Sequence, residues 1–164
     1  MKIAIISDIH DNIPNLEKCL NWVKNEGIER LICCGDVVGM DTINFLATNF
    51  SGEIFLVYGN MELYDDNDLI RYLSIKYLGR YGAAEIDGHT VGLCHEPEYI
   101  PKVLAQNPGA KIIFYGHTHK PWIETKDGIT LVNPGTLGGV FQKASFAFWE
   151  TDSGSLELKI LDMI

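Results

Sequence analysis

The sequence predicts an α/β sandwich whose strands pair in parallel in the first half of the chain and antiparallel in the second half. Up to residue 58, short apolar runs rich in Ile and Val alternate with amphipathic stretches, which is typical of parallel strands joined by helices. Later in the chain, paired apolar runs flank Asp-Gly dipeptides, which is typical of β-hairpins. Together these patterns indicate a fold that begins parallel and finishes antiparallel.

In the first half we expect strands at residues 2–7 (KIAIIS), 30–34 (RLICC) and 53–58 (EIFLVY), with helices at 12–27 and 41–50 between them. Their alternation implies parallel pairing through right-handed crossovers. The first helix has Asn12 and Pro14 at its start and Gly27 at its end, as helix termini commonly do. The two apolar helix faces consist of Leu16, Leu20 and Val23, and of Ile43, Leu46, Ala47 and Phe50.

In the second half we expect a strand at residues 111–115 (KIIFY) and three hairpins. Two hairpins turn at Asp87-Gly88 and Asp127-Gly128, and the third joins SFAFWE to SLELKIL through residues 152–154. We interpret residues 63–82 as one helix that begins at an acidic cluster, Asp65, Asp66 and Asp68.

Length and composition predict one globular domain, residues 1–164, because 164 residues with 46% apolar side chains can bury a substantial core. The net charge of -9 argues against non-specific nucleic-acid binding. The sequence contains neither an apolar run of about 18 residues nor a signal-peptide pattern, so we expect no membrane association and a cytoplasmic location. We expect reduced core thiols at Cys19, Cys33, Cys34 and Cys94, which lack a C-x-x-C spacing.

Polar side chains follow five of the expected strands, where ligands collect in open α/β sheets. They supply the oxygen and nitrogen ligands that divalent metals accept: Asp8, His10, Asp36, Asn60, His95, His117 and His119. In extended backbone, residues two apart project to the same side, so Asp8 with His10, and His117 with His119, are expected to converge.

Each motif alone also has a structural interpretation. Asp8 resembles a helix cap, and Gly35-Asp36 and Gly59-Asn60 resemble ordinary turns. The conjunction favours a metal site, because four of the five histidines occupy these strand ends. We interpret the fifth, His89, as a solvated turn residue, and three aromatic residues as core or rim, Tyr58, Phe114 and Tyr115.

In this order and at these separations, Asp8-x-His10, Gly35-Asp36, Gly59-Asn60, His95 and Gly116-His117-x-His119 resemble the calcineurin-like metallophosphoesterases. The run NPGT, residues 133–136, further resembles the small YfcE-type phosphodiesterases of that superfamily. The resemblance implies a metallophosphoesterase-type α/β sandwich with two mixed β-sheets flanked by helices. It also implies hydrolysis of a phosphodiester by in-line attack of a metal-bridging hydroxide.

The resemblance implies that two divalent metal ions share Asp36. The first ion would be held by Asp8, His10, Asp36 and His119, and the second by Asp36, Asn60, His95 and His117. Manganese (Mn²⁺) is expected from the resemblance, although nitrogen and oxygen ligands also suit Ni²⁺, Fe²⁺, Co²⁺ or Zn²⁺. Catalysis is assigned to Asp36, Asn60, His95 and Glu62.

Two positions depart from the family pattern. Many members have histidine after Gly-Asn to help protonate the leaving group, whereas this chain has Met61, which cannot donate a proton. Glu62 is then a candidate proton carrier or supporting residue, against the alternative of a surface carboxylate. Glu96 follows His95 where relatives commonly have glycine, and it would narrow the pocket, repel a dianion or alter metal preference.

The sequence leaves two alternatives to a small-molecule phosphodiesterase. The same fold serves as a non-catalytic interaction scaffold in the retromer subunit that resembles these enzymes, and a phosphatase acting on proteins is the other alternative. Every ligand position here has a competent residue, which favours the enzyme. The expected partner is a small phosphodiester, and homo-oligomerisation is left open.

Overall fold

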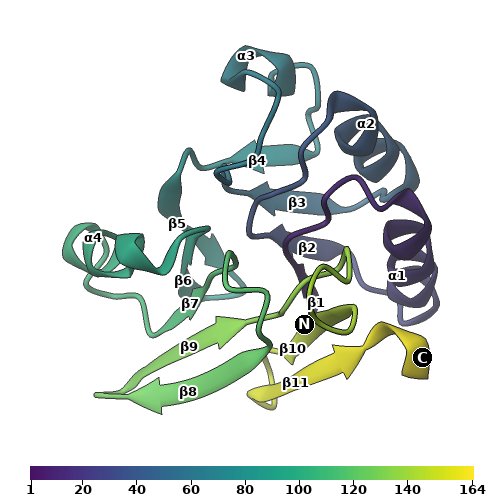
Figure 1. Cartoon of the computed structure of the whole chain (residues 1–164). Helices are drawn as coiled ribbons and strands as arrows, with labels where there is room; N and C mark the ends of the chain where they lie inside the picture. The colour runs from purple at the N-terminus through teal and green to yellow at the C-terminus, as the bar shows by residue number, and fades with distance from the viewer.

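A computed structural model describes residues 1–164 and contains eleven strands in two sheets (Figure 1). The first sheet has the order β11-β10-β1-β2-β3-β4 and the second has the order β5-β6-β7-β9-β8. The strands of the first sheet are β1 (Lys2–Ile6), β2 (Arg30–Cys33), β3 (Glu53–Leu56), β4 (Ile75–Tyr77), β10 (Ser145–Glu150) and β11 (Ser155–Ile160). Those of the second are β5 (Tyr81–Ile86), β6 (His89–Cys94), β7 (Ile112–Phe114), β8 (Trp122–Lys126) and β9 (Ile129–Asn133).

Helices cover the outer faces of both sheets (Figure 1). α1 (Ile13–Asn25) and α2 (Met40–Asn49) pack on the first sheet, α4 (Ile100–Gln106) packs on the second, and the short α3 (Asp66–Leu69) precedes β4. Two single-turn 3₁₀ helices, η1 (Pro97–Tyr99) and η2 (Leu161–Met163), complete the elements. None of the helices combines the length and apolar character needed to span a membrane.

Alternation along β1 separates the core into two parts. Ile3 and Ile5 are fully buried against residues of the second sheet, such as Phe114. Ala4 and Ile6 are fully buried on the opposite face among the side chains of the helices. Since successive residues of a strand point to opposite faces, β1 contributes to both apolar layers, and the molecule is a helix–sheet–sheet–helix sandwich.

The predicted fold class is confirmed. β1, β2 and β3 pair in parallel, whereas the β5–β6, β8–β9 and β10–β11 hairpins are antiparallel. Asn12 caps α1, its side-chain oxygen accepting a hydrogen bond from the Asn15 N–H at 3.1 Å. All four cysteines are free and buried, as expected.

The prediction of one helix at residues 63–82 is wrong. A reciprocal capping pair, Asp65 and Asp68, starts α3, but this helix ends after one turn at Leu69. The chain then becomes extended at β4, which pairs in parallel with β3 and buries Ile75 in the helix-side core. Hydrogen-bonded pairing with β3 therefore outweighs the tendency of the acidic cluster to start a longer helix.

Candidate metal centre

The polar residues predicted from the strand ends lie together where the two sheets adjoin. Residues from the first sheet follow β1, β2 and β3, and those from the second follow β6 and β7. The set comprises Asp8, His10, Asp36, Asn60, His95, His117 and His119. Asp8 and His95 are fully buried, whereas Asn60 and His117 are exposed. The centre therefore opens to the surface on the side of Asn60 and His117.

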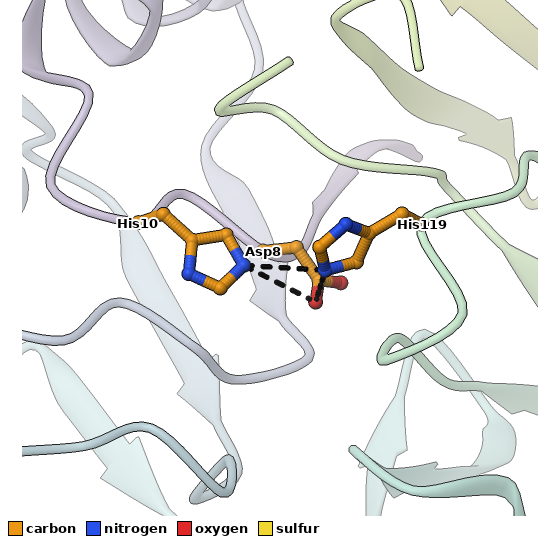
Figure 2. Close-up of side chains that lie close together, drawn as sticks. All are labelled: Asp8, His10 and His119. Atoms are coloured by element: carbon orange, nitrogen blue, oxygen red, sulfur yellow. Dashed lines mark hydrogen bonds and ion pairs between the residues drawn. The ribbon is translucent and has the colours of Figure 1, made fainter. Parts of the chain in front are cut away.

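One group of ligand atoms consists of Asp8, His10 and His119, whose side chains point toward one another in Figure 2. His119 Nε2 lies 3.0 Å from Asp8 Oδ1 and 3.2 Å from His10 Nε2. His10 Nε2 lies 3.8 Å from the same Asp8 oxygen. Two imidazole nitrogens and one carboxylate oxygen at these separations can share one divalent cation.

The neighbouring group consists of Asp36, Asn60, His95 and His117. His95 Nε2 lies 3.3 Å from Asp36 Oδ2 and 3.0 Å from Asn60 Oδ1. The same Asn60 oxygen lies 2.9 Å from His117 Nδ1. These atoms form a second set of oxygen and nitrogen donors beside the first.

Asp36 lies between the two groups, since its Oδ2 is 3.9 Å from His10 Nε2 as well as 3.3 Å from His95. The ligand atoms of Asp8, Asp36 and His95 also lie within 4.8 Å of one another. Both buried carboxylates therefore reach beyond a single group, and the two groups form one continuous centre.

Hydrogen bonds to main-chain carbonyls fix two of the imidazoles. His95 Nδ1 lies 2.7 Å from the Cys34 carbonyl and His119 Nδ1 lies 3.1 Å from the Val140 carbonyl. Each Nδ1 must carry the proton to donate to a carbonyl, which leaves Nε2 free to bind a metal. In Figure 2 the Nδ1 of His119 lies on the side of the ring away from Asp8. The His117 ring differs, because its Nδ1 faces Asn60.

The carboxylate of Asp8 has one satisfied oxygen and one unsatisfied oxygen. Oδ2 accepts hydrogen bonds from the Ser7 hydroxyl at 2.5 Å and from the His117 N–H at 3.1 Å. Oδ1 is buried and receives no hydrogen bond, because the His119 Nε2 that lies 3.0 Å from it is the unprotonated nitrogen when Nδ1 donates to the Val140 carbonyl. An unpartnered buried carboxylate oxygen is costly unless it binds a cation. This oxygen is also the one that faces His10 and His119, so the donor set fits a metal ion.

Electrostatics differ between the two carboxylates. Burial raises the pKa of the Asp8 carboxyl above its usual range, against the opposing influence of His95. Burial would also raise the pKa of Asp36, but its hydrogen bond and charge interaction with His95 hold that pKa below its usual value. Burial lowers the pKa of His95, yet the hydrogen bond that it donates to Asp36 and the charges of both aspartates raise it to about 8. Both shifts favour an ion pair between His95 and Asp36, whose Nε2 and Oδ2 lie 3.3 Å apart.

The backbone at the site is turned rather than extended. Asp8 and His10 have φ values of 53° and 48°, and His117 and His119 have values of 68° and 58°. The expectation that these pairs converge through extended backbone is therefore wrong. Asp8 and His10 still approach one another, whereas His117 and His119 face neighbouring groups. Left-handed conformations are unusual for residues other than glycine and often occur at functional sites.

Two glycines are needed because backbone approaches the carboxylates closely. A Cβ on Gly59 would lie 2.1 Å from Asp36 Oδ1, and a Cβ on Gly116 would lie 2.0 Å from Ser7 Oγ and 2.7 Å from Asp8 Oδ2. Neither Gly59 nor Gly116 has a positive φ. Glycine is therefore required here because a side chain would clash with the neighbouring groups, and not because of the backbone conformation.

The run NPGT supports the ligand loops, by which we mean the loops after β1, β2, β3, β6 and β7 that carry the candidate ligands. Asn133 Nδ2 donates to the Gly116 carbonyl at 2.8 Å, and the Thr136 hydroxyl donates to the Asp8 carbonyl at 3.0 Å. Both side chains are fully buried. Three supporting groups were missed from the sequence: the Ser7 hydroxyl and the carbonyls of Cys34 and Val140. Only Ser7 had a signal, its position beside Asp8, because carbonyl contacts depend on the fold.

The Glu62 carboxylate is partly buried and is engaged by backbone groups. Its two oxygens accept hydrogen bonds from the N–H groups of Val38, Val37 and Gly59 at 2.7, 3.2 and 3.2 Å. It thereby joins the loop after β2 to the loop after β3. Met61 is 50% exposed beside Asn60 and binds the centre only through its N–H, which donates to Asp36 Oδ1 at 3.0 Å.

Glu96 lies beside His95 at the start of η1. Its Oε1 is 3.8 Å from the Arg80 guanidinium, and its Oε2 is buried without a hydrogen-bond partner. Of the other residues interpreted from sequence, His89 is exposed in β6 and Phe114 is fully buried. Tyr58 and Tyr115 are packed against core clusters, in agreement with their interpretation as core or rim residues.

A two-sheet sandwich with adjoining carboxylate, amide and imidazole groups at its strand ends is the arrangement expected of a metal-dependent phosphoesterase. The chain belongs to the calcineurin-like phosphoesterase superfamily, whose domain model matches residues 1–154. The predicted family and the prediction of a phosphoesterase are thereby confirmed. The family implies divalent metal ions as cofactors.

Relatives with assigned names support this membership. The chain is 28% identical to the phosphodiesterase MJ0936 of Methanocaldococcus jannaschii, over 85% of this chain and 86% of that protein. It is 27% identical to the phosphodiesterase YfcE of Escherichia coli, over 84% and 79% of the two chains. The solved structure of an archaeal phosphodiesterase superposes with a TM-score of 0.86 at 25% identity, covering 98% of this chain and 99% of that one.

A relative of a different kind is also similar. The vacuolar protein sorting-associated protein 29 of Schizosaccharomyces pombe is 27% identical over 85% of this chain and 73% of that protein. The chain is therefore similar to a protein named for protein sorting as well as to proteins named as phosphodiesterases.

Proposed function

We propose that this protein is a phosphodiesterase that uses two divalent metal ions. The observation that carries the proposal is the pair of adjoining donor groups, in which the buried Oδ1 of Asp8 lacks any hydrogen-bond partner. The relatives named phosphodiesterases supply the substrate class, a small phosphodiester.

One ion would be held by Asp8, His10, Asp36 and His119, and the other by Asp36, Asn60, His95 and His117. Asp36 is the proposed shared ligand because its Oδ2 lies between His10 and His95. A carboxylate suits this position, since its two oxygens can each bind one cation. Manganese is the proposed metal, and imidazole, amide and carboxylate donors are compatible with it.

Bound ions would supply positive charge to the phosphoryl oxygens and lower the pKa of a water molecule that attacks phosphorus. The residues of the chain hold this centre in position. The Cys34 and Val140 carbonyls orient His95 and His119, and the exposed edge at Asn60 and His117 admits the ester. Because Met61 cannot donate a proton, esters with acidic leaving groups should react fastest.

We place this activity in a reducing compartment such as the cytoplasm. The four cysteines are free and buried, and the neighbours Cys33 and Cys34 do not form a bridge. Proteins of reducing compartments keep their thiols in this state.

Metal content and metal-dependent hydrolysis test the proposal together. Purified protein should contain about two equivalents of transition metal per chain, as expected for a two-metal site. Chelation should abolish hydrolysis of bis(p-nitrophenyl) phosphate, and Mn²⁺ should restore it. Activity in a demonstrably metal-free sample would contradict the mechanism. A phosphomonoester, p-nitrophenyl phosphate, is the matched comparison and should react more slowly.

The similarity to the vacuolar sorting protein favours a second candidate, a non-catalytic protein-interaction scaffold. If the protein is a scaffold, it should not hydrolyse phosphoesters even when it is loaded with metal. The intact donor set favours the enzyme, and the same hydrolysis assay distinguishes the two functions.

A further inference from the structure

Phe141 is an exposed aromatic residue at the edge of the metal centre. Its side chain is 91% exposed, more than that of any other large apolar residue in the chain. The Phe141 ring stacks on the ring of His119, with a centroid separation of 6.0 Å and an angle of 24° between the planes. One side of the phenyl ring therefore adjoins a candidate metal ligand, while most of its surface faces solvent.

The backbone holds this ring at the centre. The Val140 carbonyl accepts the Nδ1 hydrogen bond of His119 at 3.1 Å, and the preceding Gly138 N–H donates to the Asp8 carbonyl at 2.9 Å. The segment before Phe141 is thus joined to two ligand loops. Phe141 itself has a φ of 62°, a left-handed conformation that is uncommon for a bulky residue. Its position follows from contacts of the site and not from burial of its own side chain.

A second exposed apolar residue lies at the other donor group. Met61 is 50% exposed and follows Asn60, so it offers a flexible, non-aromatic contact there. The two sides of the centre therefore differ. On the His119 side the exposed apolar residue is a flat phenyl ring, which is available for stacking on a ligand.

We infer that Phe141 is a stacking platform for a planar aromatic group attached to the substrate phosphate. The inference rests on the proposed function and specifies its substrate class as phosphodiesters that carry an aryl group or a nucleobase. Aromatic rings gain from offset or parallel contact with one another, and base stacking on an exposed aromatic residue requires no hydrogen-bond readout. A phosphate held at the metal centre would place such a group beside His119 and Phe141.

Binding of phosphomonoesters to the Mn²⁺-loaded protein tests the platform without requiring turnover. Two matched pairs differ only in the ring: phenyl phosphate against methyl phosphate, and adenosine 5′-monophosphate against ribose 5-phosphate. Calorimetry should show about tenfold tighter binding of the ring-bearing member of a pair. The pair with the larger preference identifies the ring as aryl or nucleobase.

Variants at Phe141 assign the preference to this residue. Phe141→Ala should remove the ring preference and leave methyl phosphate binding unchanged, whereas Phe141→Trp should retain it. Leu73→Ala is the matched control, because Leu73 is 89% exposed but lies between α3 and β4, outside every ligand loop. It should bind as wild type does.

Equal binding within both pairs in wild type, or a preference that survives in Phe141→Ala, would overturn the platform. If no ester binds and bis(p-nitrophenyl) phosphate is not hydrolysed, the platform and the proposed function both fail. A ring preference without hydrolysis of any phosphodiester would overturn the proposed function alone. Hydrolysis of bis(p-nitrophenyl) phosphate without a ring preference would overturn the platform alone.

Discussion

At the scale of single residues, five candidate ligands have left-handed backbone, Asp8, His10, Asp36, His117 and His119. Such conformations cost on the order of 1–3 kcal/mol each and persist only where surrounding contacts enforce them. Here the contacts are side-chain and backbone hydrogen bonds to the carboxylates, such as those from Ser7 and the Met61 N–H. Hydrogen bonds from the chain thus hold the candidate ligands in place.

Asp36→Asn tests the proposed shared ligand. Asparagine tolerates left-handed backbone, so the fold should persist while one negative charge and one good ligand oxygen are lost. Mn²⁺ affinity and turnover of bis(p-nitrophenyl) phosphate should both fall by more than the roughly 10–100-fold that is typical for loss of a residue supporting a ligand. Calorimetry and initial rates provide the two measurements.

Asp127→Asn is the control for this change. Asp127 has a φ of 52° against 53° for Asp36, but it lies exposed in the β8–β9 turn. The same substitution in the same backbone conformation should leave metal binding and turnover unaltered. Similar losses in both variants would contradict the ligand assignment of Asp36.

The pH dependence of metal binding should follow His95. Its pKa is raised to about 8 in the metal-free protein, so at pH 7 a proton must leave before Nε2 can bind a metal. Mn²⁺ affinity should therefore increase with pH up to about 8 and then level off. Calorimetry in buffers of different ionisation enthalpy should detect proton release at pH 7 that disappears by about pH 9.

The same pKa shift has the opposite consequence for the stability of the metal-free protein. Because the folded-state pKa lies above the unfolded value of 6.5, the protonated form stabilises the fold. This contribution should be complete below about pH 6.5 and lost as the pH rises through about 8. Denaturant titrations of His95→Gln should lack this contribution. An unchanged pH profile in that variant would show that His95 is not the responsible group.

At the scale of elements, sequence patterns predicted the strands and hairpins well because their signals are local. Buried runs such as KIAIIS and the Asp87-Gly88 turn need no distant information. β4 could not be found this way, since its three residues are held by pairing with β3. The candidate ligands could also be picked out from the strand ends, and the structure brings their side chains together. Their ring tautomers and the role of Glu62 could not be predicted, because both depend on backbone groups from other loops.

Glu62→Gln tests whether Glu62 positions the loops or carries a proton. The amide would present a donor where the carboxylate accepts three N–H groups, so the loops after β2 and β3 should be less firmly held. We expect a lower melting temperature and weaker Mn²⁺ binding. The slope of log kcat/KM against leaving-group pKa, measured with aryl phosphodiesters, should stay steep and unchanged.

The control for Glu62→Gln is Glu124→Gln, a charge-removing change at an exposed position of β8. It should alter neither stability nor metal affinity. A wild-type slope near zero that becomes steep in Glu62→Gln would instead identify Glu62 as the proton carrier. Met61→His provides the converse comparison, because an imidazole near the leaving oxygen should flatten the slope by assisting poor leaving groups.

At the scale of the whole molecule, the metal centre and the inner core connect the same two sheets. Ile3 and Ile5 of β1 share the inner core with Leu93 of β6 and Phe114 of β7. Beyond the ends of these strands, Asp8 and His10 face His95 and His119 across the centre. The strands that bury the inner core therefore also carry the candidate ligands, and a metal ion held by these residues would link the two sheets directly.

This arrangement supports the proposal that residues 1–164 form one cooperative domain, and it predicts how metal alters unfolding. Metal-free protein should unfold in a single transition, with circular dichroism and tryptophan fluorescence giving the same midpoint. Free Mn²⁺ at 100 times the dissociation constant of a site should stabilise the fold by about 2.7 kcal/mol. For a chain of this size, each kcal/mol raises the midpoint by about 2–4 °C.

The single transition should move upward as a whole, because the proposed ligands of each ion come from both sheets. Asp36→Asn should show a much smaller shift at the same Mn²⁺ concentration, whereas Asp127→Asn should match wild type. Two transitions, of which Mn²⁺ moves only one, would contradict the single domain and place the ligands within one sheet. A uniform shift that persists in Asp36→Asn would instead mean that Mn²⁺ stabilises the protein away from the proposed centre.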